Sequence, residues 1–380
     1  MYFRLNPECY FIRGEECGAI FDLIDGKAYS LNPQETKLIA SCERNELISS
    51  NEDLLKDLKN RCIGNIYENR IYMRKLDIGS PLLERSNSFP QLQKAYLEIN
   101  NSCNRTCWFC GYYGIKRSLG CIGCNKWKEN GEALTLKRWK KLIEELNNLD
   151  CKAIFLKGGD LTLSWDKTMS ILNYAKDMFK YIYITLHQQS ISERIMNDLE
   201  NKAELIIQCE DFKDILPNAH TILLPVKPED LKNITIDRTS NKNIVIDLII
   251  QDTNHLTNIL PIISERNMSL NMYNFLNNMK YHPCLGHTLA ICYNGDIIPC
   301  PTMRNHKLGN IKNKELYTIF ENKDEGIYKF WNLNLDKVEK CKFCEFRYAC
   351  TDCRSIEEHL SGRLDSKILC SYDPKRGTWQ

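Results

Sequence analysis

Apolar residues in the first 75 positions fall into short runs that predict a small module of their own. In "AIFDLIDGKAYSL", residues 19–31, two apolar runs flank Asp25-Gly26, a dipeptide that favours a tight hairpin turn. Asn32, Pro33 and Glu35 then give the start signals of a helix, and "NEDLLKDLKNRC" predicts a second one. The apolar face predicted for this second helix comprises Leu54, Leu55, Leu58 and Cys62. A hairpin followed by short helices is typical of a winged-helix-like fold, which we predict over residues 1–75.

After a polar linker at residues 76–93, the pattern changes to apolar strands that alternate with helices. The predicted strands are "AYLEI", "AIFLKG", "YIYITL", "ELIIQC", "TILLPV" and "NIVIDLII". Between the first two lies an amphipathic helix that Thr135 can cap. Its buried stripe is predicted to be Trp139, Leu142, Ile143 and Leu146. This alternation predicts an α/β fold over residues 94–280, with a parallel sheet curled into a partial (β/α)6 barrel like that of TIM-type barrels.

The alternation lapses after residue 280, and cysteines dominate residues 281–380. This region has little apolar mass of its own, so we expect bound metal to help hold it together. The chain has 19 cysteines, yet it shows neither a signal peptide nor an apolar run of the roughly 18 residues that a membrane helix needs. We therefore expect a cytoplasmic protein whose clustered thiols bind metal rather than form a disulfide framework. A net charge of +2 and the lack of a Lys/Arg stripe argue against a nucleic-acid partner.

Three cysteines follow the first predicted barrel strand in "NNSCNRTCWFC". Cys103, Cys107 and Cys110 would lie on a loop at the C-terminal face of the barrel, where the sites of such folds are built. Thiolates favour iron–sulfur clusters or zinc. Three ligands on a cubane cluster leave one iron open, which indicates chemistry rather than a purely structural site.

The CxxxCxxC pattern after a first strand resembles that of the radical S-adenosylmethionine superfamily. The resemblance implies that Cys103, Cys107 and Cys110 hold a [4Fe–4S] cluster. S-adenosylmethionine would then chelate the fourth iron through its amino and carboxylate groups and yield a 5′-deoxyadenosyl radical on reduction. Phe109 takes the aromatic position expected near the adenine.

The second predicted strand ends in "KGGD", where the superfamily usually has Gly-Gly-Glu. The resemblance implies that Gly158, Gly159 and Asp160 bind the amino group of the cofactor, with an acid one methylene shorter than usual. His187 and Gln208 end the next two strands and could line the same mouth. We interpret His187 as structural and Gln208 as a weak contact, and place neither in the predicted site.

The cysteine-rich end contains "CLGHTLAICYNGDIIPC" and "CKFCEFRYACTDC". CxxC spacing suits two ligands on one metal, and zinc is the simpler alternative for this region. The order of the cysteines resembles the SPASM extension of radical S-adenosylmethionine enzymes, which holds two auxiliary clusters, so that three [4Fe–4S] clusters are implied in all. The resemblance assigns an outer cluster to Cys341, Cys344, Cys350 and Cys370, and an inner one to Cys284, Cys300 and Cys353.

Two points of this assignment stay open. The fourth position of the inner cluster is Cys292, His287 or an open iron, and Cys350 and Cys353 are separated by two residues where the family has three. "GCIGC" adds Cys121 and Cys124, either as a redox or metal pair or as thiols without a role. We interpret the cysteines outside these clusters as packing residues, namely Cys9, Cys17, Cys42, Cys62, Cys151 and Cys209.

The N-terminal module resembles the leader-recognition element of peptide-modifying enzymes. With a radical barrel and a SPASM extension, it implies a maturase of ribosomally made precursor peptides that binds the leader as an added strand. The expected product is a crosslink, first of all a cysteine thioether, with carbon–carbon bonding and epimerisation as alternatives. An electron donor such as a flavodoxin or ferredoxin is implied, and "CEFRYACTDCR" with "YDPKRGTWQ" is similar to a branch paired with an ATP-grasp ligase.

Two other functions compete with this one. A different SPASM enzyme, which matures a folded protein or an enzyme cofactor, would not bind a leader through residues 1–75. A non-catalytic scaffold would bind clusters without cleaving S-adenosylmethionine, although the intact CxxxCxxC loop argues against it. The modified residues, the bond formed and the oligomeric state are not encoded in any pattern of this chain.

Overall fold

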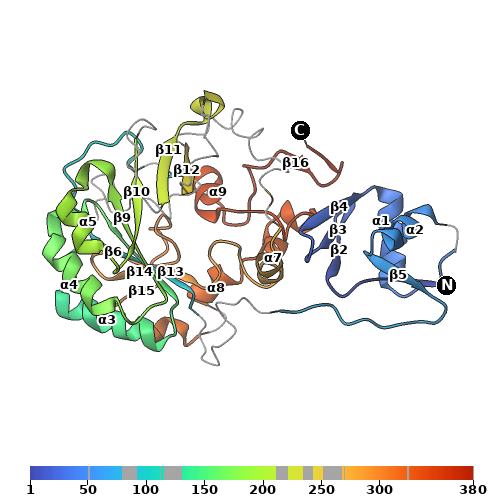
Figure 1. The fold of residues 1–380 in the computed structure, drawn as a ribbon, viewed down its shortest axis with the longest axis horizontal. Coiled ribbons are helices and arrows are strands. Elements are labelled where there is room, and N and C mark those ends of the chain that lie inside the picture. Colours follow the sequence, from blue (N-terminus) through green and yellow to red (C-terminus); the bar gives the residue numbers. More distant parts are fainter. Residues whose placement is uncertain are drawn as a thin grey trace. The chain divides into compact units, whose positions relative to one another are not determined.

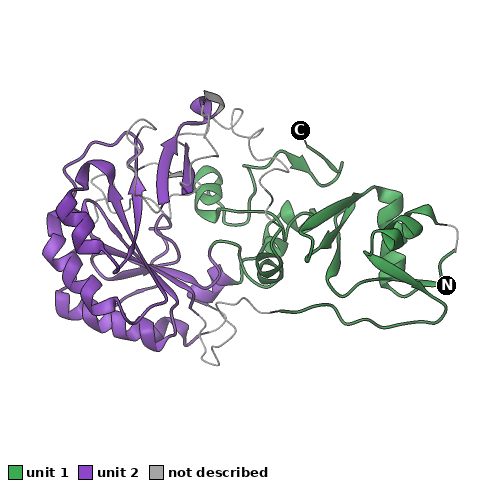
Figure 2. Cartoon of the chain, viewed as in Figure 1, with its two compact units in different colours: residues 1–84, 259–284, 332–380 green, residues 85–258, 285–331 purple. Residues whose placement is uncertain are grey.

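The computed structural model describes residues 1–49, 52–78, 92–111, 113–114, 131–210, 221–233, 243–250, 268, 270–322 and 325–379. Cys121 and Cys124, and most of the predicted linker, lie outside these residues. The chain divides into two compact units (Figure 2). Unit 1 comprises residues 1–84, 259–284 and 332–380, and unit 2 comprises residues 85–258 and 285–331.

Unit 2 is built on the predicted parallel strands, and all six of them form (Figure 1). Their order in the sheet is the order of the chain, β6-β8-β9-β10-β11-β12, as expected for successive right-handed βα units. Their bounds are β6 Lys94–Asn100, β8 Ala153–Gly158, β9 Tyr181–His187, β10 Glu204–Gln208, β11 Thr221–Val226 and β12 Asn243–Ile250. The short strand β7, Tyr113–Gly114, pairs antiparallel with β12. The partial (β/α) barrel predicted from the alternation therefore has its full set of strands.

The helices α3 Leu136–Asn148, α4 Trp165–Ala175 and α5 Glu193–Leu199 cover the outer face of this sheet (Figure 1). The Thr135 hydroxyl caps α3 by accepting a hydrogen bond from the backbone N–H of Arg138. The predicted stripe is confirmed, because its four residues are all fully buried: Trp139, Leu142, Ile143 and Leu146.

The sheet also extends past its first strand, which the sequence pattern did not predict. Strand β13, Thr288–Ile291, pairs parallel to β6, and β14, Asp296–Ile298, folds back on it as a hairpin. Gly295 sits in the turn with φ +92°, a conformation that favours glycine. Strand β15, Gly309–Asn310, and helix α8, Ile327–Trp331, complete unit 2.

In unit 1, the predicted hairpin is the pair β3–β4, and it belongs to a three-stranded antiparallel sheet of order β2-β3-β4. The capping box of α1 is present, since Asn32 accepts from the N–H of Glu35 while Glu35 accepts from the N–H of Asn32. Leu55 and Leu58 of α2 are buried, but Cys62 lies beyond the end of that helix and is exposed, so it is not a packing residue. The bounds are β1 Tyr2–Leu5, β2 Cys9–Arg13, β3 Gly18–Asp22, β4 Lys27–Leu31, β5 Gly64–Tyr67, α1 Pro33–Glu43 and α2 Asp53–Asn60.

Both faces of the β2-β3-β4 sheet are covered within unit 1. Ile20 on one face packs in a core with residues of α1 and α2. On the other face, Ala19 and Phe21 pack with Phe346 and with helix α7, Met272–Asn278. Unit 1 also contains α9 Arg354–Ser361, β16 Tyr372–Asp373 and β17 Thr378–Trp379. The N-terminal module therefore shares one apolar core with the cysteine-rich end of the chain.

Within the described residues, no helix combines the length and the apolar character that crossing a membrane requires.

Candidate cofactor site

The loop after β6 carries the three predicted cluster ligands and borders a pocket at the carboxyl ends of the barrel strands. Phe109, buried to 1% exposure, lies in its wall, and so do the glycines after β8. The lining residues are Cys103, Arg105, Cys107, Phe109, Cys110, Gly158, Gly159, Asp160, Thr185, Leu186, His187 and Gln208. The structure thus brings together every residue predicted for the cluster and the cofactor in unit 2.

Gly158 and Gly159 are required by how closely two strand ends approach each other. A Cβ on Gly158 would lie 2.5 Å from the carbonyl oxygen of Asn100, and one on Gly159 would lie 2.2 Å from that of Ser102. Gly159 also donates its N–H to Asn100, and Asp160 donates its N–H to Ser102 at 2.7 Å. The absence of side chains at the two glycines therefore lets the cysteine loop lie against the end of β8. The family resemblance had assigned these glycines to contact with the cofactor.

Asp160 presents its carboxylate at the pocket wall. One oxygen accepts from the N–H and the hydroxyl of Thr162 at 3.0 and 2.6 Å, and the other accepts from Ser190 at 3.1 Å. Burial raises the pKa of Asp160, but these hydrogen bonds and the charge of Arg105 outweigh it, and the pKa lies below its usual value. The carboxylate is therefore ionised and available to a positively charged group.

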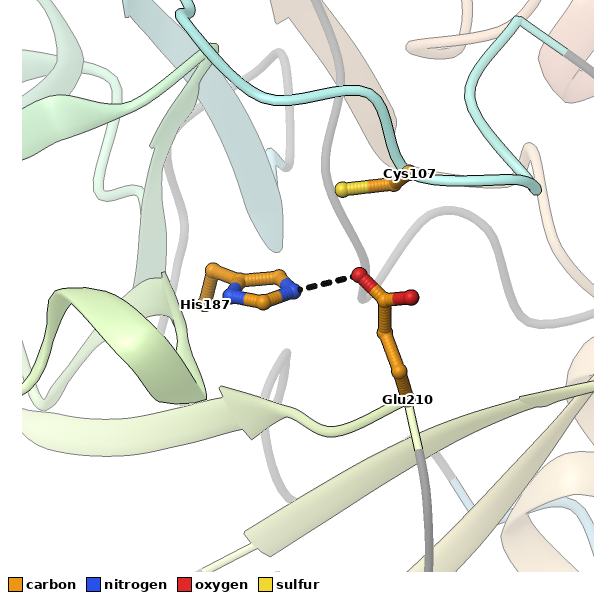
Figure 3. A group of neighbouring side chains, drawn as sticks. All are labelled: Cys107, His187 and Glu210. Carbon is orange, nitrogen blue, oxygen red and sulfur yellow. Dashed lines mark hydrogen bonds and ion pairs between the residues drawn. The ribbon is translucent and has the colours of Figure 1, made fainter.

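His187, which the sequence already allowed at this mouth, and Glu210, which no sequence pattern singled out, lie beside Cys107 (Figure 3). The His187 ring is bonded to Glu210 at 3.0 Å, and their ligand atoms and the Cys107 sulfur all lie within 4.8 Å of one another. Burial lowers the pKa of His187, and burial together with Glu210 raises the pKa of Cys107 to about 12. Cys107 is thus a protonated thiol until a metal displaces its proton. Glu210 carries no sequence signal, because it lies beyond the strand end.

The donor set of this pocket fits a cluster with S-adenosylmethionine. Cys103, Cys107 and Cys110, the three thiols predicted to hold the cluster, all lie in its wall. Two buried donors face no partner among the described residues, the Arg105 Nε–H and the Gln208 side-chain amide. Such unpaired donors in a pocket wall are expected where a polar ligand supplies the acceptors.

The four cysteines assigned to the outer auxiliary cluster gather in unit 1. Cys341 and Cys350 pack with Leu335 and Val338, while Cys344 and Cys370 border the core that contains Phe21. Burial raises the pKa of Cys350 to about 11, with Cys370 adding to it.

A buried network of charges lies beside these thiols. Asp352 accepts from Lys367 at 2.7 Å and from His282 at 2.9 Å, and it also pairs with Arg354. Lys367 reaches Glu357 at 3.3 Å. The positive charges of Lys367 and Arg354 act against the burial that raises the pKa of Cys341, so they favour the thiolate that a metal needs.

The inner set is distributed over both units, since Cys284 and Cys353 belong to unit 1 and Cys300 to unit 2. Cys284 is exposed, and its N–H donates to His282, which no sequence pattern singled out. Cys292 is buried in an apolar core with Tyr96 and Phe155. This packing accounts for Cys292 as a core residue, so it is the weaker candidate for the open fourth position. His287, the other candidate, is buried against Trp331.

Two family models match the chain. The model of the radical SAM superfamily matches residues 97–216, which include the three-cysteine loop and the Gly-Gly-Asp turn. The model of the SPASM iron–sulfur cluster-binding domain matches residues 284–354. A search of curated proteins gave no match.

Among solved structures, SuiB from Streptococcus suis is similar over 96% of this chain and 99% of its own, with 13% identity and a TM-score of 0.50. SuiB bound to its precursor peptide SuiA gives a TM-score of 0.48 at 13% identity, over 97% of this chain and 99% of that one. BtrN in complex with AdoMet and 2-DOIA covers 69% of this chain and 94% of its own, at 17% identity and a TM-score of 0.37. At these identities the likeness to SuiB is one of fold. With the two family matches and the geometry of the pocket, this chain is an enzyme built from a radical SAM domain, which binds a [4Fe–4S] cluster and S-adenosylmethionine, and a SPASM domain, which binds auxiliary iron–sulfur clusters.

Proposed function

We propose that the enzyme modifies a ribosomally made precursor peptide and forms a crosslink in it, a cysteine thioether in the first place. The observation that carries the peptide substrate is an unpaired edge of the N-terminal sheet, the one formed by β4. Among the described strands, β4 pairs with β3 on one side and with no strand on the other. Lys27, Ala28 and Ser30 of β4 are exposed. An extended leader can add to such an edge through backbone hydrogen bonds.

The geometry around β4 supports the edge, rather than a face of the sheet, as the docking place. Within unit 1 the helices α1 and α2 pack on one face, and α7 with the cysteine-rich end packs on the other. A peptide that bound over the covered part of either face would have to displace this core. The proposed leader-recognition module is thus the winged-helix-like segment over residues 1–75, with the leader bound along the edge of β4.

Cys103, Cys107 and Cys110 would hold the cluster that binds S-adenosylmethionine. The bound pair supplies a 5′-deoxyadenosyl radical, which abstracts hydrogen from an unactivated carbon of the peptide. Asp160 would accept hydrogen bonds from the amino group of the cofactor, and Phe109 would pack near its adenine. The carboxylate suits this role because it is ionised and lies in the pocket wall.

A thioether requires the loss of two hydrogens, one from carbon and one from the cysteine thiol. The first leaves as a hydrogen atom in 5′-deoxyadenosine, and the second leaves as a proton and an electron. We propose that the auxiliary clusters take this electron, the outer one on Cys341, Cys344, Cys350 and Cys370 and the inner one on Cys284, Cys300 and Cys353. A flavodoxin or ferredoxin would exchange electrons with the enzyme, and an ATP-grasp ligase stays a prediction from the sequence.

SuiB, whose fold this chain shares, has been crystallised with its own precursor peptide. For this enzyme, the test uses a synthetic peptide encoded by a short cysteine-rich reading frame beside the gene. The reduced enzyme should convert it, with S-adenosylmethionine, to a product lighter by two hydrogen atoms. Binding of the peptide should slow hydrogen exchange at the amides of Lys27–Leu31. An unchanged exchange rate on β4 with full peptide binding would contradict docking of the leader at this edge.

A further inference from the structure

Arg105 lies between the first two cluster cysteines and extends along the wall of the cofactor pocket. Its side chain is 19% exposed. One terminal nitrogen donates to the side-chain oxygen of Gln189 at 2.7 Å. The other donates to Ser190 at 2.6 Å and lies 3.3 Å from Asp160. The guanidinium is thus fixed beside the carboxylate predicted to receive the amino group of S-adenosylmethionine.

The two charges are held in place by elements on either side of the pocket. Thr162 anchors one oxygen of Asp160, and Ser190 donates to the other oxygen while it accepts from Arg105. Asp160 follows β8, and Ser190 follows β9. The pair therefore presents an anion and a cation side by side, with both orientations determined before any ligand arrives.

Arg105 still has an unused donor. Its Nε–H is buried and has no hydrogen-bond partner in the described part of the chain. The side-chain amide of Gln208, in a residue exposed by 2%, is a second buried donor of the same pocket without a partner. Leaving such donors unpaired is costly, so a ligand with acceptor oxygens is expected beside them.

The ligand that matches an adjacent carboxylate and guanidinium is an amino-acid zwitterion, whose ammonium and carboxylate groups are attached to one carbon. The methionine part of S-adenosylmethionine carries this zwitterion. We propose that Arg105 recognises the carboxylate of S-adenosylmethionine through its Nε–H, while Asp160 takes the ammonium group. This inference rests on the assignment of the pocket to S-adenosylmethionine.

In this role Arg105 discriminates between ligands by charge. It strengthens the binding of a cofactor that bears the carboxylate. It does not strengthen the binding of the decarboxylated form, whose ammonium group still fits Asp160. A residue that only shaped the cysteine loop would also change the iron content, because the cysteines of this loop hold the cluster. The two ligands and the iron content together therefore separate recognition from loop structure.

The experiment measures the dissociation constants of S-adenosylmethionine and of its decarboxylated analogue, by equilibrium dialysis with thiol-reduced, anaerobically reconstituted full-length enzyme. Arg105→Met should raise the dissociation constant of S-adenosylmethionine by roughly 10- to 100-fold, the contribution of a charge-assisted hydrogen bond. The dissociation constant of the analogue should stay unchanged. Arg105→Lys keeps the charge but loses the planar guanidinium group, so its dissociation constant for S-adenosylmethionine should lie between those of the unmodified enzyme and Arg105→Met. Iron per chain is measured for each variant, so that a lost cluster is recognised.

Arg194→Met is the matched control, because Arg194 is 78% exposed and 3.9 Å from its ion-pair partner Asp198. Neither dissociation constant should change in this control. Equal weakening of both ligands by Arg105→Met, or no weakening of either at normal iron content, would overturn the proposal. If the unmodified enzyme does not bind S-adenosylmethionine at all, the assignment of the pocket fails instead, and the two failures are distinguishable.

Discussion

In the loop after β6, Cys103 and Cys107 are half-buried beside a pocket whose walls carry Arg105, Asp160 and Gln208. In unit 1, by contrast, Cys341 is buried among Leu335 and Val338. Around the thiols of the loop lie polar groups, two of which have hydrogen-bond donors without a partner among the described residues. The array surrounds its thiols with apolar side chains and with charges that already pair with each other.

In the proposed mechanism, this difference separates the cluster that binds a ligand from the auxiliary clusters that take up an electron. A cluster that must admit a ligand needs a polar, open wall, and the pocket provides one. A cluster with all its ligands from the protein needs exclusion of water and fixed charges, which the apolar core and the pairing of Asp352 with Lys367 and Arg354 provide. The two regions therefore predict different consequences for the same substitution.

Replacing one cysteine in each region should have the largest effect. Cys107→Ala should abolish 5′-deoxyadenosine formation from S-adenosylmethionine, because the open cluster loses a ligand. Cys344→Ala should lose about four iron atoms per chain and keep 5′-deoxyadenosine formation without peptide present. Iron analysis and chromatography of the nucleoside check both variants. If Cys107→Ala still produced 5′-deoxyadenosine, the loop would not hold the catalytic cluster.

Breaking the charge network of unit 1 should have the next largest effect. Asp352→Asn leaves Lys367 and Arg354 without their shared anion, and removing one partner of a buried pair costs about 3–5 kcal/mol. Urea unfolding of the anaerobic protein should show this loss. Asp373→Asn is the control, since its partner Arg376 is 75% exposed and such pairs contribute only about 0–1 kcal/mol. Equal stability of the two variants would contradict a closed, charge-stabilised array.

The cysteine loop depends on the glycine turn, which Gly159→Ala tests. The added Cβ would lie 2.2 Å from the Ser102 carbonyl, and the loop would have to move at a cost of about 1–3 kcal/mol. We expect weaker binding of S-adenosylmethionine and less iron. Gly309→Ala in the same unit is the control, because the nearest atom to its Cβ would be 3.7 Å away. A Gly159→Ala protein with full iron and unchanged affinity would show that the loop does not need this close approach.

The smallest expected effect concerns the orientation of Asp160. Thr162→Val removes the hydroxyl hydrogen bond to the carboxylate but keeps the backbone one, a loss of about 1 kcal/mol or roughly fivefold in affinity for S-adenosylmethionine. Thr318→Val, whose hydroxyl bonds only to the backbone of Glu315 among the described residues, is the matched control. Identical affinities in the two variants would mean that Asp160 needs no such support.

Local patterns were sufficient to predict what depends on neighbouring residues. The strand alternation, the stripe of α3 and the capping box of α1 are all present, because each depends on residues a few positions apart. The sequence also identified the two motifs that meet in the pocket. A resemblance to a known family supplied their meaning.

What the patterns missed depends on contacts between distant segments. Strand β13 joins β6 although nearly 200 positions separate them, and its four residues are too few to show a clear strand periodicity. Arg105 and Glu210 belong to loops, where side-chain direction follows from the fold rather than from spacing. The second buried face of the N-terminal sheet was missed for the same reason, since Phe346 covers it from the far end of the chain.

The central claim is that the cluster on the three-cysteine loop keeps one iron for S-adenosylmethionine while the array keeps none for it. Electron–nuclear double resonance on the reduced, reconstituted enzyme with S-adenosylmethionine labelled with ¹⁵N at its amino group tests this most directly. We predict a nitrogen coupling to a cluster signal that persists in Cys344→Ala and disappears in Cys107→Ala. A coupling that survived Cys107→Ala, or the absence of any nitrogen coupling in the unmodified enzyme, would contradict the assignment.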